Sequence, residues 1–483
     1  MLFFAICHRW LETPFWNVNG SRLMMSLALA KGVNYYVLLP PGGPLYSTLY
    51  GPLAAIVYLP ATLFSSPNSA VLAGSAITIL LCFSAVAYLH FAPLNAGRNA
   101  VDVLAFLAAG LLVCYLEPLK YSCFNIHADG PGLAFAAAAC GVLYPGDRRK
   151  WRIALPLSAL FAVLSISSKQ MFLPVPLALL AWLMVIDRRP AAVRYLVWLV
   201  VLGALAGATA LFIAGPQNLF HSLIWMPAHH PWNEASRVAG FVQSARHFIR
   251  LSMPVPVLLL ASLVYWWMER RPQPADLRAW ANNRCVPLLL VGVALLPFSI
   301  AGRAKTGGDI NSLSFALFFL TCGLTVMLAD VSRFAPLPAT RLLAISTLVA
   351  VVLPLAISEA PLVLNIRSRI RQLPEAGQQV AFAYLIRHPG EAYFPWYPLA
   401  HYCAEHQFRH YGFGIGDRLL AHEPLTMAEF RAYIPSNPRI VAFAADGSPD
   451  VWGYDLMRFL PEYNHEVRDP ELPGWQVYAK ALP

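Results

Sequence analysis

The chain has 483 residues, of which 58% are hydrophobic and only 12% are charged. Soluble domains carry about 25% charged residues, so this composition excludes a soluble globular protein and indicates one with many membrane spans. The formal net charge of +10 comes mostly from short clusters of Lys and Arg between apolar runs. Because no basic face with interleaved aromatic residues is present, we exclude nucleic acid as a partner.

The N-terminal segment and the cysteines give two further limits. Met1–Cys7 is apolar but too short to span a bilayer, and it lacks the basic region and cleavage site of a signal peptide. We interpret it as the end of a first transmembrane helix whose beginning is missing. The eight cysteines have no paired spacing and no CxxC motif, so they indicate neither a disulfide framework nor a zinc site.

Residues 10–68 are mixed in character. They are polar at Glu12–Arg22, amphipathic at Leu23–Leu29 and rich in turn-forming residues at Leu39–Pro44. Tyr50–Phe64 is apolar but contains Pro52 and Pro60, which predicts an interfacial or half-buried helix rather than a full span.

Apolar segments close to the length of a membrane span follow. They are Ala70–Phe91, Val101–Leu116, Gly132–Tyr144, Ile153–Ile166, Met171–Ile186, Tyr195–Ala214, Leu251–Met268, Val286–Ala301, Ser312–Leu328 and Leu342–Ile357. Together with the first helix they predict an all-α polytopic transmembrane bundle of about 10–11 spans.

The loops give the orientation of this bundle. One alternating set carries most of the Lys and Arg, for example Arg148, Arg149, Lys150 and Arg152, and the positive-inside rule places that set in the cytoplasm. The exoplasmic side then receives Trp10–Asn68, Glu117–Pro131, Ser167–Gln170, Gly215–Arg250, Gly302–Asn311 and everything after about Glu359.

The C-terminal region is more polar than the rest of the chain. Helix-like stretches occur near Glu375–Ile386 and Thr426–Tyr433, and β-like runs occur at Ile440–Phe443 and Trp475–Tyr478. This pattern predicts a small α/β exoplasmic domain. The predicted organisation is therefore residues 1–68 as the first helix and outer loop, 69–358 as the bundle and 359–483 as the exoplasmic domain.

The outward loops hold nearly all of the unusual polar residues. Leu116–Cys140 places Glu117, Lys120, His127 and Asp129 between two apolar runs. Ionisable groups that face lipid cost about 2.5–3.5 kcal/mol, so such groups lie at an interface or a functional cavity. Asp129 before Gly130-Pro131 also fits a helix N-cap, and that interpretation stays open.

Polar groups at one membrane face favour an enzyme that acts on a lipid-linked substrate. A proton-coupled transporter would bury acidic groups near the bilayer midplane and show matching broken helices in two halves, and neither is found in the sequence. A lipid-linked glycan transporter or flippase and a non-catalytic membrane scaffold remain as alternatives.

Several features together resemble a known family. A long first outer loop ends in Pro40-Pro41-Gly42-Gly43-Pro44-Leu45-Tyr46, followed by Tyr50-Gly51-Pro52-Leu53. An Asp stands at the outer start of a helix in His127-Ala128-Asp129-Gly130-Pro131. Lys169-Gln170 separates two spans, and a soluble domain follows the last span. This arrangement resembles the GT-C glycosyltransferases, and most closely their protein O-mannosyltransferase and aminoarabinose-transferase branch.

The resemblance implies a GT-C fold and an inverting transfer of a sugar from a polyprenyl-phosphate donor. The acceptor would be a glycan, lipid or protein at the exoplasmic face of the bacterial inner membrane. The family usually carries an Asp early in the first outer loop, whereas this chain has Asn17 and Asn19 there. An amide cannot accept a proton as a carboxylate does. Either Glu12 or Asp129 then takes the role, or the protein has lost activity.

The candidate site residues fall into three groups. The acidic candidates for catalysis are Asp129, Glu12 and Glu117. For the donor phosphate we select Arg303 and Lys305, which flank a Gly-Gly turn before a helix N-terminus, and Lys169 between two short spans; a snorkelling Arg303 in an ordinary loop is the alternative. Candidate acceptor or sugar contacts are Asn17, Asn19, His127, Gln170 and Asp309.

No metal site is predicted. His229-His230-Pro231-Trp232 contains metal-ligand side chains, but the spacing fits no standard pattern, and we interpret it as an interfacial loop. No cofactor is certain, and a divalent cation, Mg or Mn, stays open.

Overall fold

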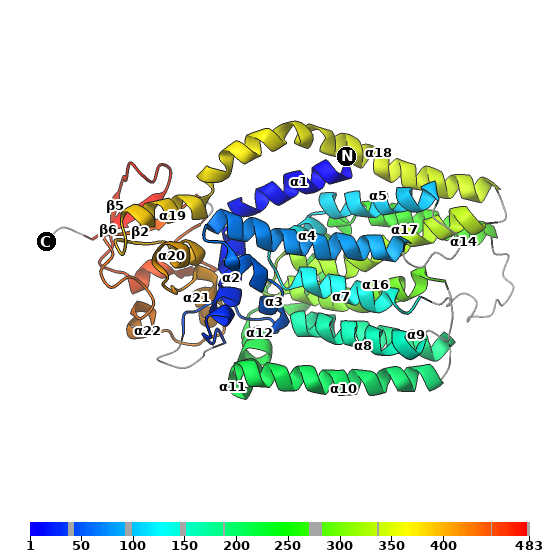
Figure 1. Ribbon diagram of the computed structural model, residues 1–483, viewed down its shortest axis with the longest axis horizontal. Coiled ribbons are helices and arrows are strands. Elements are labelled where there is room, and N and C mark those ends of the chain that lie inside the picture. Colours follow the sequence, from blue (N-terminus) through cyan, green and yellow to red (C-terminus); the bar gives the residue numbers. More distant parts are fainter. Residues whose placement is uncertain are drawn as a thin grey trace.

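The computed structural model describes residues 1–36, 43–91, 99–144, 151–186, 189–269, 283–335, 338–445 and 447–480. A bundle of long helices occupies one end of the molecule, and a small domain with short strands occupies the other (Figure 1). α18 runs along one side of the bundle and α10 along the opposite side. The predicted cytoplasmic residues Arg148, Arg149 and Lys150 lie outside the described ranges.

Each predicted span overlaps one helix of the bundle. The bundle helices are α1 (Leu2–Glu12), α4 (Pro67–Phe91), α5 (Ala100–Tyr115), α7 (Asp129–Gly141), α8 (Trp151–Ser168), α9 (Pro174–Ile186), α10 (Arg189–Ala214), α14 (Pro254–Glu269), α16 (Cys285–Ala304), α17 (Ser314–Phe334) and α18 (Pro338–Gln372). Within the described residues, 6 helices are long and apolar enough to cross a membrane, or up to 8 if each bent pair is one span. α7 and α9 have 13 residues each and are shorter than a full span.

Hydropathy does not decide where a helix lies in the bundle. α17 is mostly apolar, and its Phe315, Phe318 and Phe319 are completely buried among α5, α16 and α18. α10 is equally apolar but lies at the edge, where Phe212 exposes 92% of its surface. Apolar side chains exposed along a whole helix are expected where that helix faces lipid.

Short helices cover the end of the bundle nearest the small domain. They are η1 (Thr13–Phe15), α2 (Asn17–Ala30), α3 (Leu53–Ile56), η2 (Leu59–Leu63), α6 (Glu117–Phe124), η4 (Gln170–Phe172), α11 (Pro216–Phe220), η5 (His221–Trp225), α12 (Met226–His229), α13 (Arg237–Leu251) and η6 (Ile310–Leu313).

Two of the segments described from the sequence differ in the structure. The stretch Asn17–Arg22, predicted as polar loop, forms the first turns of α2. The predicted interfacial helix at Tyr50–Phe64 is split into the short helices α3 and η2, because proline cannot donate the hydrogen bond that a continuous helix requires.

The small domain combines helices with a sheet, which confirms the predicted α/β character. Its elements are η7 (Leu373–Glu375), α19 (Gly377–Arg387), β1 (Ala392–Tyr393), α20 (Pro398–Glu405), α21 (Gly412–Leu420), α22 (Met427–Arg431), β2 (Ile440–Phe443), β3 (Asp450–Val451), β4 (Tyr454–Asp455), η8 (Leu456–Phe459), β5 (His465–Val467) and β6 (Gln476–Ala479). The sheet order is β1-β2-β6-β5, with β1 parallel to β2 and the other pairs antiparallel.

α2 joins the small domain to the bundle. Leu23 and Met24 of α2 are fully buried in the same hydrophobic cluster as Leu399 of α20 and Ile415 of α21. Figure 1 shows α2 crossing the molecule between the bundle and this domain. Because one core includes both, the end of the bundle is held against the C-terminal domain.

The loop before α3 is held against the end of α8. The Gly51 N–H donates a hydrogen bond to the Ser168 carbonyl oxygen at 3.2 Å. A Cβ added at Gly51 would lie 2.0 Å from the Ser167 carbonyl oxygen, whereas one added at Gly203 in α10 would meet nothing within 4 Å. Only glycine therefore permits the close approach at residue 51.

We expect Gly51→Ala to lower the free energy of unfolding by about 1–3 kcal/mol, because the added methyl group must push two backbone segments apart. Thermal unfolding of the purified protein in detergent measures the change. Gly203→Ala is the matched control and should unfold no earlier than wild type, because alanine favours a helix by about 1 kcal/mol over glycine. Equal melting temperatures for Gly51→Ala and wild type would contradict this prediction.

Candidate functional site

Asp129 begins α7, but its side chain does not cap that helix. The N-cap is Ala128, and no side-chain hydrogen bond caps the first turn. The carboxylate is instead fully buried and binds side chains from other segments. The N-cap interpretation of Asp129 is therefore wrong.

Four side chains surround the Asp129 carboxylate. Lys169 Nζ donates to Oδ1 at 2.7 Å, and Asn311 Nδ2 donates to Oδ2 at 2.6 Å. His127 Nδ1 lies 2.7 Å from Oδ2, and Ser122 Oγ donates to the same oxygen at 3.2 Å. Moving a carboxylate out of water costs several kcal/mol unless charges and hydrogen bonds compensate. This set of donors supplies that compensation.

The contacts of His127 define its protonation. Its Nδ1 lies 2.7 Å from the Asp129 carboxylate and 3.2 Å from the Asp129 backbone N–H. The shorter contact, to a charged acceptor, requires that Nδ1 carry the proton, so Nε2 accepts from the Tyr50 hydroxyl at 2.9 Å. Burial, together with the nearby Arg22 charge, lowers the pKa of His127 to about 3, so the ring is neutral at physiological pH.

Lys169 and Gln170 contact two neighbouring regions. The Lys169 ammonium group lies 5.1 Å from the Tyr50 ring centre and 4.9 Å from that of Phe315, in addition to its ion pair with Asp129. Gln170 Nε2 donates to the carbonyl oxygens of Leu49 at 3.1 Å and Leu223 at 3.2 Å. The pair therefore connects the buried carboxylate to the loop before α3 and to η5.

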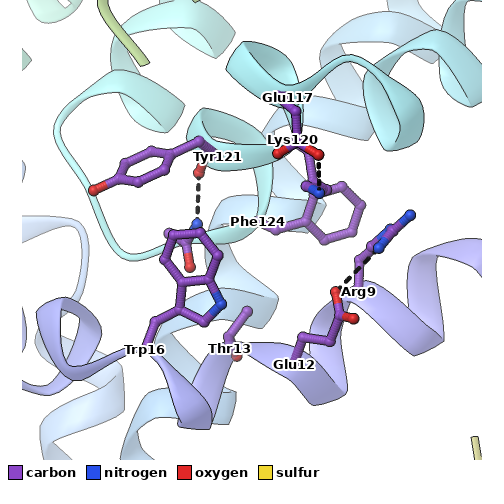
Figure 2. Close-up of a pocket in the computed structure, with 9 residues that line it drawn as sticks. Arg9, Glu12, Thr13, Trp16, Glu117, Lys120, Tyr121 and Phe124 are labelled. Atoms are coloured by element: carbon purple, nitrogen blue, oxygen red, sulfur yellow. Dashed lines mark hydrogen bonds and ion pairs between the residues drawn. The ribbon is translucent and has the colours of Figure 1, made fainter. Parts of the chain in front are cut away.

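Glu12 and Glu117 lie at a separate small cavity. Figure 2 shows them reaching toward it from α1 and α6. Glu12 Oε2 accepts from Arg9 at 3.2 Å, and Glu117 Oε1 accepts from Lys120 at 2.6 Å. The cavity holds about 20 Å³, which is room for a water molecule rather than a sugar. The structure does not bring these two carboxylates into contact with Asp129.

The two asparagines that stand in place of the family's acidic residue lie in the first turn of α2. Asn19 is completely buried: its Nδ2 donates to the Thr13 carbonyl and to Asn125 Oδ1, both at 2.8 Å, while its Oδ1 accepts from the Ile126 N–H at 2.8 Å. An amide can donate and accept at once, which a carboxylate cannot. Asn19 therefore fastens the outer loop to α6. Asn17 is half-buried, and its predicted acceptor contact stays a prediction.

Arg303 and Lys305 bind carbonyl oxygens of nearby loops. Arg303 Nη1 donates to Gly308 at 3.0 Å, and Lys305 Nζ donates to Pro227 at 2.6 Å. Asp309 is exposed, and its own carboxylate caps η6 by accepting from the Ile310 N–H at 2.6 Å. Within the described residues neither cation forms an ion pair with an acid, and their role toward phosphate stays a prediction.

The sequence analysis missed Tyr50, Asn311, Arg22 and Asp417. Tyr50 and Asn311 stand inside stretches that were singled out, but an aromatic or amide side chain in an interfacial loop gives no signal by itself. Asp417 belongs to α21, where Ser47 Oγ donates to Oδ2 at 2.5 Å. Burial raises the pKa of Asp417. Only the folded structure brings this carboxylate to the outer end of the bundle.

An apolar groove of about 670 Å³ lies between α8, α9 and α10. Its lining is mostly aliphatic, and its polar side chains are Ser167, Gln170 and Thr209, whose hydroxyl donates to the Leu205 carbonyl oxygen. Gly51 forms part of the lining. Because Gly51 follows Tyr50 and Gln170 follows Lys169, the polar end of the groove, at Ser167 and Gln170, lies beside the Asp129 cluster.

The class of the protein, an integral membrane glycosyltransferase of GT-C fold, follows from a family model and from two solved structures that share its fold. The chain belongs to Glycosyltransferase family 87, whose family model matches residues 48–297. No curated protein matches the chain. The GT-C resemblance noted in the sequence is thereby confirmed.

Two solved structures share the fold. The chain is similar to ArnT from Cupriavidus metallidurans bound to undecaprenyl phosphate, with TM-score 0.56 and 12% sequence identity over 98% of this chain and 96% of that chain. It is also similar to the apo state of the same ArnT, with TM-score 0.52 and 13% identity over 95% and 92% of the two chains. At these identities the likeness shows the fold.

We expect Asp129→Asn to destabilise the protein by about 3–5 kcal/mol, because it leaves the Lys169 ammonium buried without a counter-charge. Lys169→Met should cost a similar amount. The double variant Asp129→Asn/Lys169→Met should cost clearly less than the sum, since both charges are removed together.

Thermal unfolding in detergent measures these effects. Glu117→Gln is the control, because it breaks an ion pair in which the Glu117 side chain is 49% exposed, and such pairs contribute about 0–1 kcal/mol. Additive losses in the double variant would show that the two residues do not act as a pair.

Proposed function

We propose that this protein transfers a sugar from a polyprenyl-phosphate donor to a glycan, lipid or protein acceptor at the exoplasmic membrane face. The observation that carries the proposal is the apolar groove, whose polar end adjoins Lys169 and Tyr50. A polyprenyl chain is apolar and its phosphate is anionic, so such a donor needs both environments next to each other. The similar ArnT structure is bound to a lipid of this kind, undecaprenyl phosphate.

The chemistry needs one carboxylate and one cation. In an inverting transfer the acceptor hydroxyl attacks the anomeric carbon, a carboxylate takes the hydroxyl proton, and the lipid phosphate leaves. Asp129 and Glu12 are the two acidic candidates. Because four donors already bind the Asp129 carboxylate, we assign to it the positioning of Lys169 and His127. Glu12 is then the remaining candidate for the base, and the small cavity beside it in Figure 2 would have to widen to admit an acceptor.

The positive-inside rule supports the exoplasmic placement and the inner membrane of a bacterium as the location. Ile126, three residues before Asp129, is buried in the hydrophobic core that includes the C-terminal domain. Asp129 therefore lies at the end of the bundle where the sequence predicts the outward loops. A divalent cation, Mg²⁺ or Mn²⁺, stays part of the hypothesis. Within the described residues no three His, Cys, Asp or Glu side chains gather to hold one, and transfer assays with and without a chelator measure the requirement.

Transfer by the purified protein in lipid, with a panel of radiolabelled polyprenyl-phosphate sugars, tests the proposal. We expect wild type to transfer or release sugar and Glu12→Gln to lose at least 100-fold in kcat, as expected for a missing general base. Asp129→Asn should lose activity together with stability. Arg303→Ala should lower kcat/KM if Arg303 contacts the donor phosphate, and an unchanged value would remove it as a candidate. If no donor is turned over by wild type, a transporter or a scaffold replaces the enzyme.

Filling the groove should selectively weaken donor use. Ala206 lines the groove from α10, whereas its neighbour Leu205 does not line it and is 62% exposed. We expect Ala206→Trp to raise the KM for a polyprenyl-phosphate sugar about tenfold or more, which corresponds to about 1.4 kcal/mol of lost binding. Leu205→Trp adds the same ring on a different face of the helix and should leave the KM unchanged. Equal effects of the two variants would argue against the groove as the lipid site.

A further inference from the structure

Arg22 lies where the bundle meets the C-terminal domain. It follows Ser21 in α2, and the next residues, Leu23 and Met24, are buried in the core shared with that domain. The guanidinium lies over the Tyr121 ring, 5.7 Å from its centre. Although Arg22 lies deep in this junction, its side chain keeps part of its surface accessible, so it faces a space that water can enter.

The surroundings of Arg22 lack a paired carboxylate. The titratable groups that act on it most strongly are the hydroxyls of Tyr121, Tyr50 and Tyr411. Arg22 acts electrostatically on the Asp417 carboxylate, but within the described residues the two form no ion pair, and Arg22 Nη1 is buried without a hydrogen-bond partner.

Three other arginines inside the molecule each form an ion pair with a carboxylate. Arg9 binds Glu12 and Glu359, Arg284 binds Asp330, and Arg333 binds Asp102. A cation removed from bulk water is normally paired in this way, because the loss of hydration is otherwise uncompensated. A cation–π contact with Tyr121 offsets only part of that loss. In the part of the chain that the structure describes, no carboxylate forms an ion pair with Arg22, which leaves its guanidinium available to an external anion.

The other candidate cations differ from Arg22 in their surroundings. The charge of Lys169 is already neutralised by Asp129, whereas Arg303 and Lys305 donate to backbone carbonyl oxygens and stay alternative cations for the phosphate. Tyr50 connects Arg22 to the lipid groove, since it acts electrostatically on Arg22 and precedes the groove residue Gly51. A lipid in that groove would carry its head group toward Tyr50.

We propose that Arg22 holds the phosphate of the lipid-linked donor, in a subsite walled by Tyr121 from the bundle and Tyr411 from the C-terminal domain. The inference rests on the proposed function and names the residue that recognises the leaving group. A guanidinium suits this task because its planar fork donates two parallel hydrogen bonds to phosphate oxygens. When the bond between the anomeric carbon and the phosphate oxygen breaks, the phosphate keeps the electron pair, and Arg22 stabilises the added negative charge.

Sugar transfer by the full-length protein in nanodiscs tests this role. We expect Arg22→Gln to lower kcat/KM for the donor by about 100- to 1,000-fold, the usual effect of removing a donor to a developing charge. Arg22→Lys should recover part of the loss, because it keeps the charge but not the fork. Arg431→Gln is the matched control, since Arg431 binds Glu462 on the surface of the C-terminal domain, and it should behave as wild type.

Binding separates recognition of phosphate from a structural role. Wild type should bind polyprenyl phosphate at least tenfold more tightly than the neutral polyprenol, and Arg22→Gln should lose this preference. A purely structural stack on Tyr121 would lower the melting temperature but leave the preference intact. Competition by inorganic phosphate at millimolar concentration would show that the phosphate group suffices, whereas its failure to compete would assign the source to the lipid.

Two outcomes would overturn the inference, and they differ. If Arg22→Gln keeps both the preference and a kcat/KM within threefold of wild type while Ala206→Trp still weakens donor use, Arg22 does not hold the phosphate and the proposed function stands. If wild type neither transfers sugar nor prefers polyprenyl phosphate over polyprenol, the proposed function fails and this inference fails with it.

Discussion

The buried ion pair between Asp129 and Lys169 joins the segments that form the outer end of the bundle. The Asp129 carboxylate also binds His127 before α7, Asn311 in η6 and Ser122 in α6. A charge so deep in a membrane protein is tolerated only if every donor around it is in place. The loops that carry these donors are therefore fixed relative to one another, and through His127 the position of Tyr50 is fixed as well.

This constraint places two unlike environments beside each other. On one side of Tyr50 and Lys169 is the aliphatic groove between α8, α9 and α10, and on the other is the junction that contains Arg22. A substrate with a long apolar chain and an anionic head group requires this combination. α2 and the C-terminal domain share one core, so the domain supplies Tyr411 and Asp417 to the same region instead of acting as a detached module.

Much of the site was predictable from local sequence because charged residues are rare in this chain. Asp129 and Lys169 were both selected on that ground, and the structure brings them together at 2.7 Å. The predicted contact of Asn19 with an acceptor was harder to judge from the sequence. In the structure its amide forms hydrogen bonds to backbone and side-chain groups of the protein itself. Arg22 could not be selected from the sequence because an arginine in a polar stretch is ordinary. It becomes unusual only in the structure, where no described carboxylate forms an ion pair with it and Nη1 has no hydrogen-bond partner.

The sequence by itself determined the membrane bundle, its helices and the mixed C-terminal domain, since hydropathy and periodicity are local properties that each segment carries alone. Tertiary structure alone decided which polar groups meet. The partners of Asp129 are separated from it by up to 182 residues, and Asp417 reaches the bundle from the other end of the chain. Such contacts depend on how helices pack and on which buried charges find compensation, and no local pattern encodes either.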